Sequence, residues 1–326
     1  MSELEAKILE RVTAKKASME GVRKFFTALP FLGPFLFLII LFYLVPVILT
    51  FTMSLTSMDY ALEWNFVGLK NFVRFFQDSS VKIVVLNTVK YVVYTLMINV
   101  GFGFFLAVAT SYFIKNENLR LAFQTIWMLP RMTPPVVYAL LWLWFLDPTE
   151  AGTLNSVLHK LFGLPAQNWI LNHPMKVVIV ANGLIGTSLA MVVFSAAIKS
   201  IPVDYFRAAS VDGASDWDVV RHVIVPFLKW PIMFMTIWQT LSLITSYEYI
   251  LLITDGGPLN RSEVLSLFSY HKAFSNYEFG YGAAISTVLV IFAVILAVVM
   301  LKVFGYDAIM MRGEIDEKRD KDHISF

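Results

Sequence analysis

Polar side chains recur along one apolar stretch of the sequence at the spacing of a helical face. Steps of three or four residues join Gln239, Ser242, the Thr245 and Ser246 pair, and Tyr249. Such steps return to the same side of an α-helix. Amides and hydroxyls hydrogen-bond to solute hydroxyls, and a tyrosine ring packs on a sugar face. We therefore expect a path for a hydroxylated solute, with hydrogen bonding between helices as the alternative use.

The third, fourth and fifth apolar stretches contain further polar and charged residues. Asn182, Thr187 and Ser188 lie in the fourth stretch, Glu248 in the fifth, and Arg131 deep in the third. Polar and ionisable residues are costly within a membrane, so they are candidates for function by default. We expect Arg131 and Glu248 to pair with each other or to line a watery cavity, or Arg131 to meet an anionic solute.

Patterns for catalysis or metal binding are missing from the sequence. The five histidines are scattered without metal-ligand spacing. The chain has no cysteine, which excludes disulfides and thiolate sites. It also has no P-loop, so any ATP used must be hydrolysed by another polypeptide. We expect no metal, cofactor or catalysis in this chain, and the net charge of +2 gives no indication of nucleic-acid binding.

The elements that position these side chains are membrane-spanning helices. The sequence is 57% hydrophobic and only 15% charged, which is typical of a membrane protein and not of a soluble domain. Runs of about 20 apolar residues cross a hydrocarbon core. They predict spans at 29–51, 86–112, 121–146, 175–198, 230–253 and 282–304. Prolines 130, 134 and 135 predict a bend in the third span, since proline removes a backbone hydrogen bond.

The distribution of lysine and arginine predicts the orientation. Most of these residues lie in 1–28, 113–120, 199–229 and 302–326, whereas the alternate connections hold few. By the positive-inside rule the former segments face the cytoplasm. We expect a cytoplasmic N-terminal segment at 1–28, a transmembrane domain at 29–304 and a cytoplasmic tail at 305–326. The first span lacks a cleavage site and is expected to be its own insertion signal.

A polar island, residues 199–228, separates the fourth and fifth spans. It begins with Ile201 and Pro202, breaks at Gly213 and continues helically until Pro226, which we expect to stop the helix. Interhelical loops rarely have this length or this regular punctuation. The segment therefore predicts a helix, a glycine break and a second helix that fit a groove on a cytoplasmic partner.

The island and two other regions resemble the permease subunits of bacterial ATP-binding-cassette (ABC) importers of carbohydrates. The island resembles the EAA cytoplasmic loop through Ile201-Pro202, Tyr205, Ala208-Ala209, Asp212-Gly213-Ala214, Ile224 and Pro226. The outer-loop pattern of the carbohydrate branch is matched by Tyr247-Glu248, Thr254, Gly256-Gly257-Pro258, Ser262, Tyr270, Ala273-Phe274 and Gly280 to Ala284. The first outer stretch is matched by Phe66 to Leu69, Asn71 and Asn87-Thr88. The chain is most similar to the maltose-type and glycerol-phosphate-type first permease.

This resemblance implies an all-α type I importer fold with six transmembrane helices in a bacterial inner membrane. It implies a second, different permease, two ATPase subunits that hold ATP and Mg, and a soluble binding protein that delivers the solute from outside. The residues expected to couple to the ATPase are Arg207, Ala208, Ala209, Asp212, Gly213 and Ala214. Arg207 departs from the family pattern, which usually has a glutamate there, so its contact with the ATPase should differ.

Two other classes of function stay open at this point. A secondary, ion-coupled transporter needs no such island and more often has intramembrane acid clusters or paired broken helices. An intramembrane enzyme needs converging acid, base or metal-binding residues. The kind of sugar is open as well, since Arg131, Lys90 and Lys176 leave room for an acidic solute or a neutral oligosaccharide.

Overall fold

Long apolar runs fold as helices because a backbone in hydrocarbon must satisfy its N–H and C=O groups within the same segment. The computed structural model describes residue 27 and residues 30–304. The expected segments 1–28 and 305–326 lie outside the described residues, apart from residue 27. Within the described part, five helices are long and apolar enough to cross a membrane: Pro30–Ser54, Ser79–Phe113, Pro174–Lys199, Asp216–Thr245 and Phe279–Val303.

The third span is divided between two shorter helices, α6 (Glu117–Met132) and α7 (Pro135–Phe145). Thr133 and Pro134 between them are extended, because a residue before proline is disfavoured in the α region. Pro130 lies inside α6 without ending it. The expected bend is therefore confirmed at the Pro134-Pro135 step, and this pair completes the six-helix type I fold.

Three of these five long helices contain α-helical stretches joined to π-helical turns, and the other two are α-helical throughout. The α-helical parts are α2 (Val45–Ser54), α4 (Ser79–Leu96), α5 (Gly103–Val108), α10 (Pro174–Lys199), α12 (Asp216–Val219), α13 (Val225–Thr245) and α16 (Phe279–Val303). The π-helical turns are Ile40–Leu44, Met97–Phe102, Ala109–Phe113 and Val220–Ile224. Such turns are frequent at functional sites in helices.

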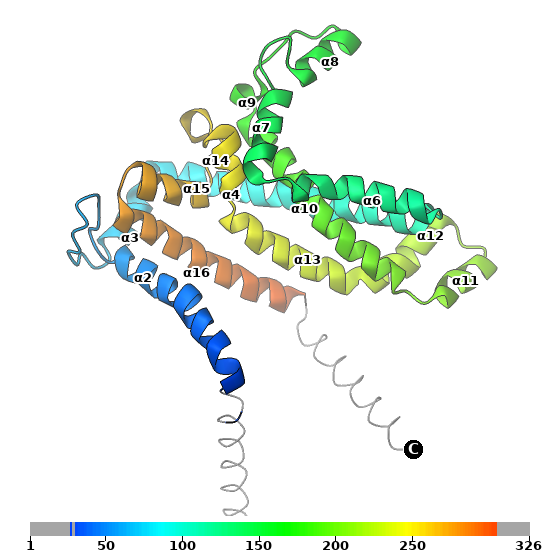
Figure 1. Cartoon of the computed structure of the whole chain (residues 1–326), viewed down its shortest axis with the longest axis horizontal. Coiled ribbons are helices and arrows are strands. Elements are labelled where there is room, and N and C mark those ends of the chain that lie inside the picture. The colour runs from blue at the N-terminus through cyan, green and yellow to red at the C-terminus, as the bar shows by residue number, and fades with distance from the viewer. Residues whose placement is uncertain (1–26, 28–29, 305–326) are drawn as a thin grey trace, which may run out of the picture.

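Helix α10 is the central element of the bundle and contacts α4, α5, α6, α13 and the short helix α14 (Glu248–Thr254) (Figure 1). Close approach depends on small residues. A Cβ at Gly103 would lie 2.5 Å from the Ala190 side chain, and one at Gly183 would lie 2.8 Å from Ile98. The glycines thus allow the second and fourth spans to touch almost backbone to backbone.

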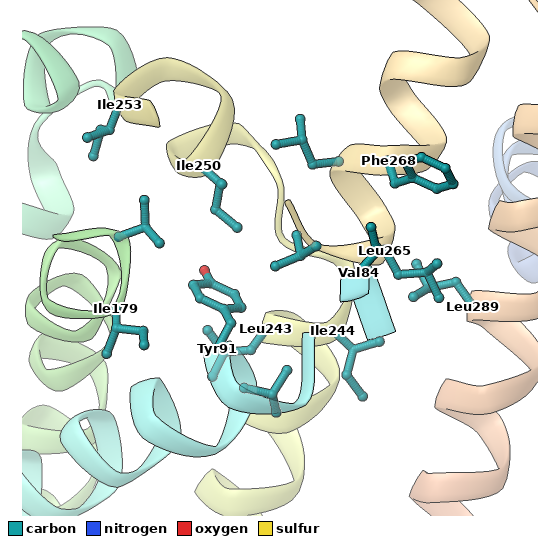
Figure 2. Close-up of a cluster of buried hydrophobic side chains, with 14 of the residues drawn as sticks. Val84, Tyr91, Ile179, Leu243, Ile244, Ile250, Ile253, Leu265, Phe268 and Leu289 are labelled. Atoms are coloured by element: carbon teal, nitrogen blue, oxygen red, sulfur yellow. The ribbon is translucent and has the colours of Figure 1, made fainter. Parts of the chain in front are cut away.

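Two hydrophobic clusters lie along α10. The first joins α4, α10, α13, α14, α15 (Leu265–Tyr270) and α16. Figure 2 shows Tyr91 among its aliphatic side chains, which include Ile179, Leu243 and Ile250. The second joins α5, α10 and the start of α13, with Phe194 and Leu228 fully buried. The helix that contains α2 packs on α16, and most of its apolar side chains stay exposed, as expected for a surface against lipid or another subunit.

Shorter helices connect the spans. They are α3 (Lys70–Gln77), α8 (Thr153–Phe162), α9 (Trp169–Asn172), α11 (Val203–Val211), α14 (Glu248–Thr254) and α15 (Leu265–Tyr270). Figure 1 shows α8 projecting away from the bundle beyond α7, while α11 lies at one end of the bundle next to α12.

The polar island folds as expected up to its break and differs after it. Helix α11 ends at Val211, and Gly213 has φ +71°. The expectation that Pro226 stops the second helix is wrong, because one continuous helix runs from Asp216 to Thr245. Pro226 lies inside this continuous helix, directly after the π-helical turn Val220–Ile224. A proline removes one intrahelical hydrogen bond and can bend a helix without ending it, and π-helical turns are likewise sites where long helices bend.

Candidate functional site

A polar cavity of about 290 Å³ lies where α6, α10, α13 and α14 meet. Most of its lining groups are amides, hydroxyls or a guanidinium. The lining residues are Arg131, Asn182, Ile185, Gly186, Gln239, Ser242, Leu243, Ser246 and Tyr249. Six of the side chains singled out in the sequence are therefore brought together, from helices that are up to about 120 positions apart in the chain.

Two lining residues, Asn182 and Ser246, form a hydrogen-bonded group with Tyr91, which lies outside the lining. Asn182 Nδ2 donates to the Tyr91 hydroxyl and, at 3.2 Å, to Ser246 Oγ. Tyr91 Oη donates to Ser246 Oγ at 3.3 Å. Tyr91 is fully buried and holds Asn182 and Ser246 in place, because a buried hydroxyl that loses its partner is costly.

Gln239 connects the cavity to a close crossing of the second and fourth spans. Its Nε2 donates to the Gly186 carbonyl oxygen at 3.0 Å, and its amide lies 3.3 Å from that of the buried Asn99. A Cβ at Gly186 would lie 2.1 Å from Asn99 Nδ2. Gly186 and Gln239 line the cavity, so this polar contact between α10, α13 and the π-helical turn Met97–Phe102 lies beside it.

Tyr249 reaches the cavity from a different helix than the sequence predicted. Helix α13 ends at Thr245, and Ser246 is extended. The Ser246 carbonyl, freed by this break, accepts a 2.7 Å hydrogen bond from Ser266 Oγ. Tyr249 lies on α14, where its ring meets Tyr138 edge to face at 5.8 Å. The broken helix, and not a continuous face, places Ser246 and Tyr249 at one cavity.

Four predicted path residues do not line this cavity. Thr187 Oγ1 donates to Gly183 O of its own helix at 2.8 Å and to Ile98 O of the second span at 3.3 Å, and Ser188 Oγ donates to Trp127 O of α6 at 2.5 Å. Both hydroxyls thus bond helices, the alternative use. Thr245 bonds only to carbonyls of its own helix. Glu248 lies outside the lining at the start of α14.

Arg131 does not pair with Glu248. Among the described residues its guanidinium forms no ion pair and no side-chain hydrogen bond. A cation at the C-terminal end of α6 gains about 0.3–1 kcal/mol from the helix dipole. An arginine at the centre of a membrane helix costs at least about 2.5 kcal/mol. The dipole therefore does not offset the cost, and contact with the polar cavity explains the position better.

Two residues that organise the site were missed by the sequence reasoning. Tyr91 and Asn99 both lie in the second apolar stretch, and their polar groups inside a span were the available signal. They were overlooked because helical spacing relates residues within one stretch only, and Tyr91 and Asn99 lie in a different stretch from the polar residues of the fourth and fifth stretches. Conversely, Lys90 and Lys176 do not line the cavity.

The island presents a second hollow, of about 280 Å³, between α11 and the start of the fifth span. It is lined by Tyr205, Ala208, Ala209, Asp212, Ala214, Asp218, Val219, His222 and Val223. Ser215 and Asp218 form a capping box that fixes the start of α12. Of the predicted coupling residues, Arg207 and Gly213 do not line this hollow, and Arg207 pairs with Asp204 at 3.2 Å on the surface.

The connection after α14 contains a histidine between two carboxylates. His271 Nδ1 lies 2.9 Å from the Glu263 carboxylate, and Nε2 lies 3.0 Å from that of Asp255. Glu263 is only 3% exposed, and its burial raises the pKa of the carboxyl above the ordinary value. A Cβ at Gly256, where φ is +80°, would meet the Glu263 side chain. Within the described residues no group of three His, Asp or Glu side chains is arranged to hold a metal ion.

Replacing Glu263 with glutamine should change the pH dependence of stability. Because the folded pKa is raised, Glu263 binds its proton more tightly in the folded state. Its contribution is complete below about pH 4.3, the ordinary glutamate pKa, and is lost as pH rises through the folded pKa. Glu263→Gln should remove this decline from melting temperatures measured between about pH 4 and 8. The exposed Glu150→Gln should keep it, and identical profiles for both variants would contradict the burial argument.

The fold and the polar cavity define the class: a multi-span helical membrane permease. The chain belongs to the family of binding-protein-dependent transport system inner membrane components, whose family model matches residues 99–306. It is therefore a component of a transport system of the inner membrane, and the expected ABC permease resemblance is confirmed. This favours the ABC permease over the secondary transporter and over the intramembrane enzyme.

Individual relatives agree with this assignment. The chain is 29% identical over 270 residues to a probable ABC transporter permease protein of Pyrococcus horikoshii, covering 81% of this chain and 91% of the relative. It is 28% identical over 282 residues to the arabinooligosaccharides transport system permease protein AraP of Bacillus subtilis, covering 84% and 87%. A solved bacterial ABC transporter involved in import of the acidic polysaccharide alginate has a TM-score of 0.76 at 20% identity, covering 88% and 98%. That likeness shows the fold.

Proposed function

We propose that this chain forms half of the translocation path of an ATP-driven carbohydrate importer. The observation that carries the proposal is the cavity, in which two amides, two serine hydroxyls and a tyrosine ring face one space. These groups suit the hydroxyls and the apolar ring face of a sugar. The similarity to AraP, whose name describes oligosaccharide transport, supports the same solute class.

The other half of the path comes from a second permease. The cavity is only partly enclosed, and the helix Pro30–Ser54 has almost no buried residues in the single chain. A path for a polar solute must be closed against lipid, because lipid cannot satisfy hydrogen-bonding groups. A second permease and a solute-binding protein outside the membrane complete the assembly. The termini and the island 199–228 face the cytoplasm.

The island 199–228 couples the chain to an ATPase subunit, which binds ATP and Mg. Its hollow and two exposed apolar side chains form the docking surface: Val211 is 87% exposed and Trp217 is 70% exposed. Large exposed apolar side chains at a polar surface mark a contact with another protein. The Arg207 pair with Asp204 is exposed and contributes little, so an acidic residue of the ATPase can replace Asp204 as its partner.

Ser242 gives a direct test of the solute path. Its side chain lines the cavity and forms no hydrogen bond within the described chain, so Ser242→Ala removes a solute contact without breaking a structural bond. We expect the KM for sugar uptake to rise about three- to tenfold, since one hydrogen bond contributes about 0.5–1.5 kcal/mol. The measurement is ATP-dependent uptake of labelled oligosaccharides by proteoliposomes that contain the assembled transporter.

The matched control is Thr236→Val on the same helix. Thr236 Oγ1 bonds only to the Ile232 carbonyl at 2.7 Å, and the residue is outside the cavity. We expect uptake by this variant to equal that of the wild type. Uptake driven by an ion gradient without ATP, or an equal effect of the two substitutions, would contradict the proposed function.

A further inference from the structure

The cavity carries one formal charge, and that charge is positive. Arg131 is the only ionisable acid or base with a full charge at neutral pH among the lining residues, and no carboxylate lines the space. A guanidinium has five N–H donors. None of them is used within the described part of the chain, since Arg131 forms neither an ion pair nor a side-chain hydrogen bond there. The cavity therefore offers a set of unsatisfied cationic donors.

Arg131 lines the cavity, whereas the other cations considered in the spanning helices do not. Lys90 on α4 and Lys176 on α10 are also exposed cations of spanning helices, but neither lines the cavity. Glu248, the carboxylate closest to Tyr249 in sequence, forms no ion pair with Arg131 and does not line the space either. The other polar lining groups are neutral. A solute with a negative group is thus the complementary occupant.

We propose that this cavity selects hydroxylated solutes that carry an anionic group, a carboxylate or a phosphate, and that Arg131 binds that group. This inference rests on the proposed carbohydrate function and narrows it. The planar guanidinium matches either anion through two parallel N–H bonds. Asn182, Gln239 and Ser242 then form hydrogen bonds with the hydroxyls of the solute. The partial enclosure of the site strengthens the interaction between the guanidinium and the anion relative to the same interaction in water.

The test compares three probes that share one ring: D-galacturonate, D-galactose 6-phosphate and D-galactose. Each is titrated against the assembled transporter in nanodiscs, with binding followed by calorimetry. We expect at least one anionic probe to bind the wild type about tenfold or more tightly than galactose, equivalent to about 1.4 kcal/mol. The ratio should fall to about one in Arg131→Gln. It should be partly kept in Arg131→Lys, which keeps the charge but loses the paired geometry. The tighter binder of the two anionic probes shows whether the cavity prefers a carboxylate or a phosphate.

Lys90→Gln is the matched control, because it removes one cation from a span outside the cavity. It should retain the wild-type ratio. The inference is overturned if galactose binds as well as both anions, if no probe binds, or if Lys90→Gln lowers the ratio as much as Arg131→Gln. ATP-driven uptake of a neutral oligosaccharide that is unchanged in Arg131→Gln would overturn only the anion selectivity. Absence of any ATP-driven sugar uptake would overturn the proposed function itself.

Discussion

Gly186→Ala should destabilise the bundle by about 1–3 kcal/mol, the cost of overpacking a core contact. A Cβ at this position would lie 2.1 Å from Asn99 Nδ2, and Asn99 is fully buried. The added methyl group forces α10 away from the second span. It thereby disturbs the hydrogen bond from Gln239 to the Gly186 carbonyl beside the cavity. Both the melting temperature and sugar uptake of the purified transporter should fall.

Gly101→Ala is the control for this substitution. Gly101 lies in the same π-helical turn as Asn99, and a Cβ there has no neighbour within 4 Å. Alanine is favoured over glycine in a helix by up to about 1 kcal/mol, so Gly101→Ala should leave the stability unchanged or raise it. The two substitutions are thus expected to have opposite signs. A Gly186→Ala protein as stable as Gly101→Ala would show that the crossing has room to relax.

Gly213→Val should abolish ATP-driven transport while leaving membrane insertion intact. Gly213 has φ +71° and no neighbour within 4 Å of an added Cβ. The effect therefore comes from the left-handed backbone, which costs a residue with a Cβ about 1–2 kcal/mol and more when it is β-branched. The turn between α11 and α12 would open and change the surface offered to the ATPase. Solute-stimulated ATPase activity and uptake are the measurements.

Gly163→Val is the control for Gly213→Val, because it introduces the same backbone strain at a position outside the island. Gly163 follows α8 with φ +65°, and a Cβ there also meets nothing within 4 Å. Both variants thus carry the same strain, but Gly163 directly follows α8, which projects away from the bundle and lies apart from α11 and α12 of the island (Figure 1). We expect Gly163→Val to insert and transport. Normal solute-stimulated ATPase activity in Gly213→Val would reject the role of the island as the coupling segment.

Much of the fold follows from local properties of the sequence. Apolar length predicts the spans, because hydrocarbon leaves no alternative to intrahelical hydrogen bonds. Proline chemistry predicts the bend at Pro134 and Pro135, and a glycine between two short polar helices predicts the turn at Gly213. Pro226 shows the limit of such rules. Pro226 lies inside a continuous helix, directly after a π-helical turn, so a proline in the sequence does not by itself show whether a helix ends or only bends.

The candidate site was only partly predictable. Asn182, Gln239, Ser242 and Ser246 were recognised as polar residues in apolar stretches, and they do line one cavity. Thr187 and Ser188 carry the same signal in the sequence, yet their hydroxyls bond to backbone carbonyls of neighbouring turns and helices. A hydroxyl in a membrane span can line a solute path or form a hydrogen bond to another helix, and the neighbouring residues in the sequence do not show which of the two it does.

The sequence by itself determined the class of protein, the spans and the polar island, because these depend on hydrogen bonding and apolar length within each segment. Tertiary structure alone decided which polar groups meet. Tyr91 reaches Asn182 and Ser246 only because α4, α10 and α13 pack together. Tyr249 reaches the cavity only because the fifth span breaks at Ser246. Such meetings depend on contacts between residues far apart in the chain, which helical periodicity does not encode.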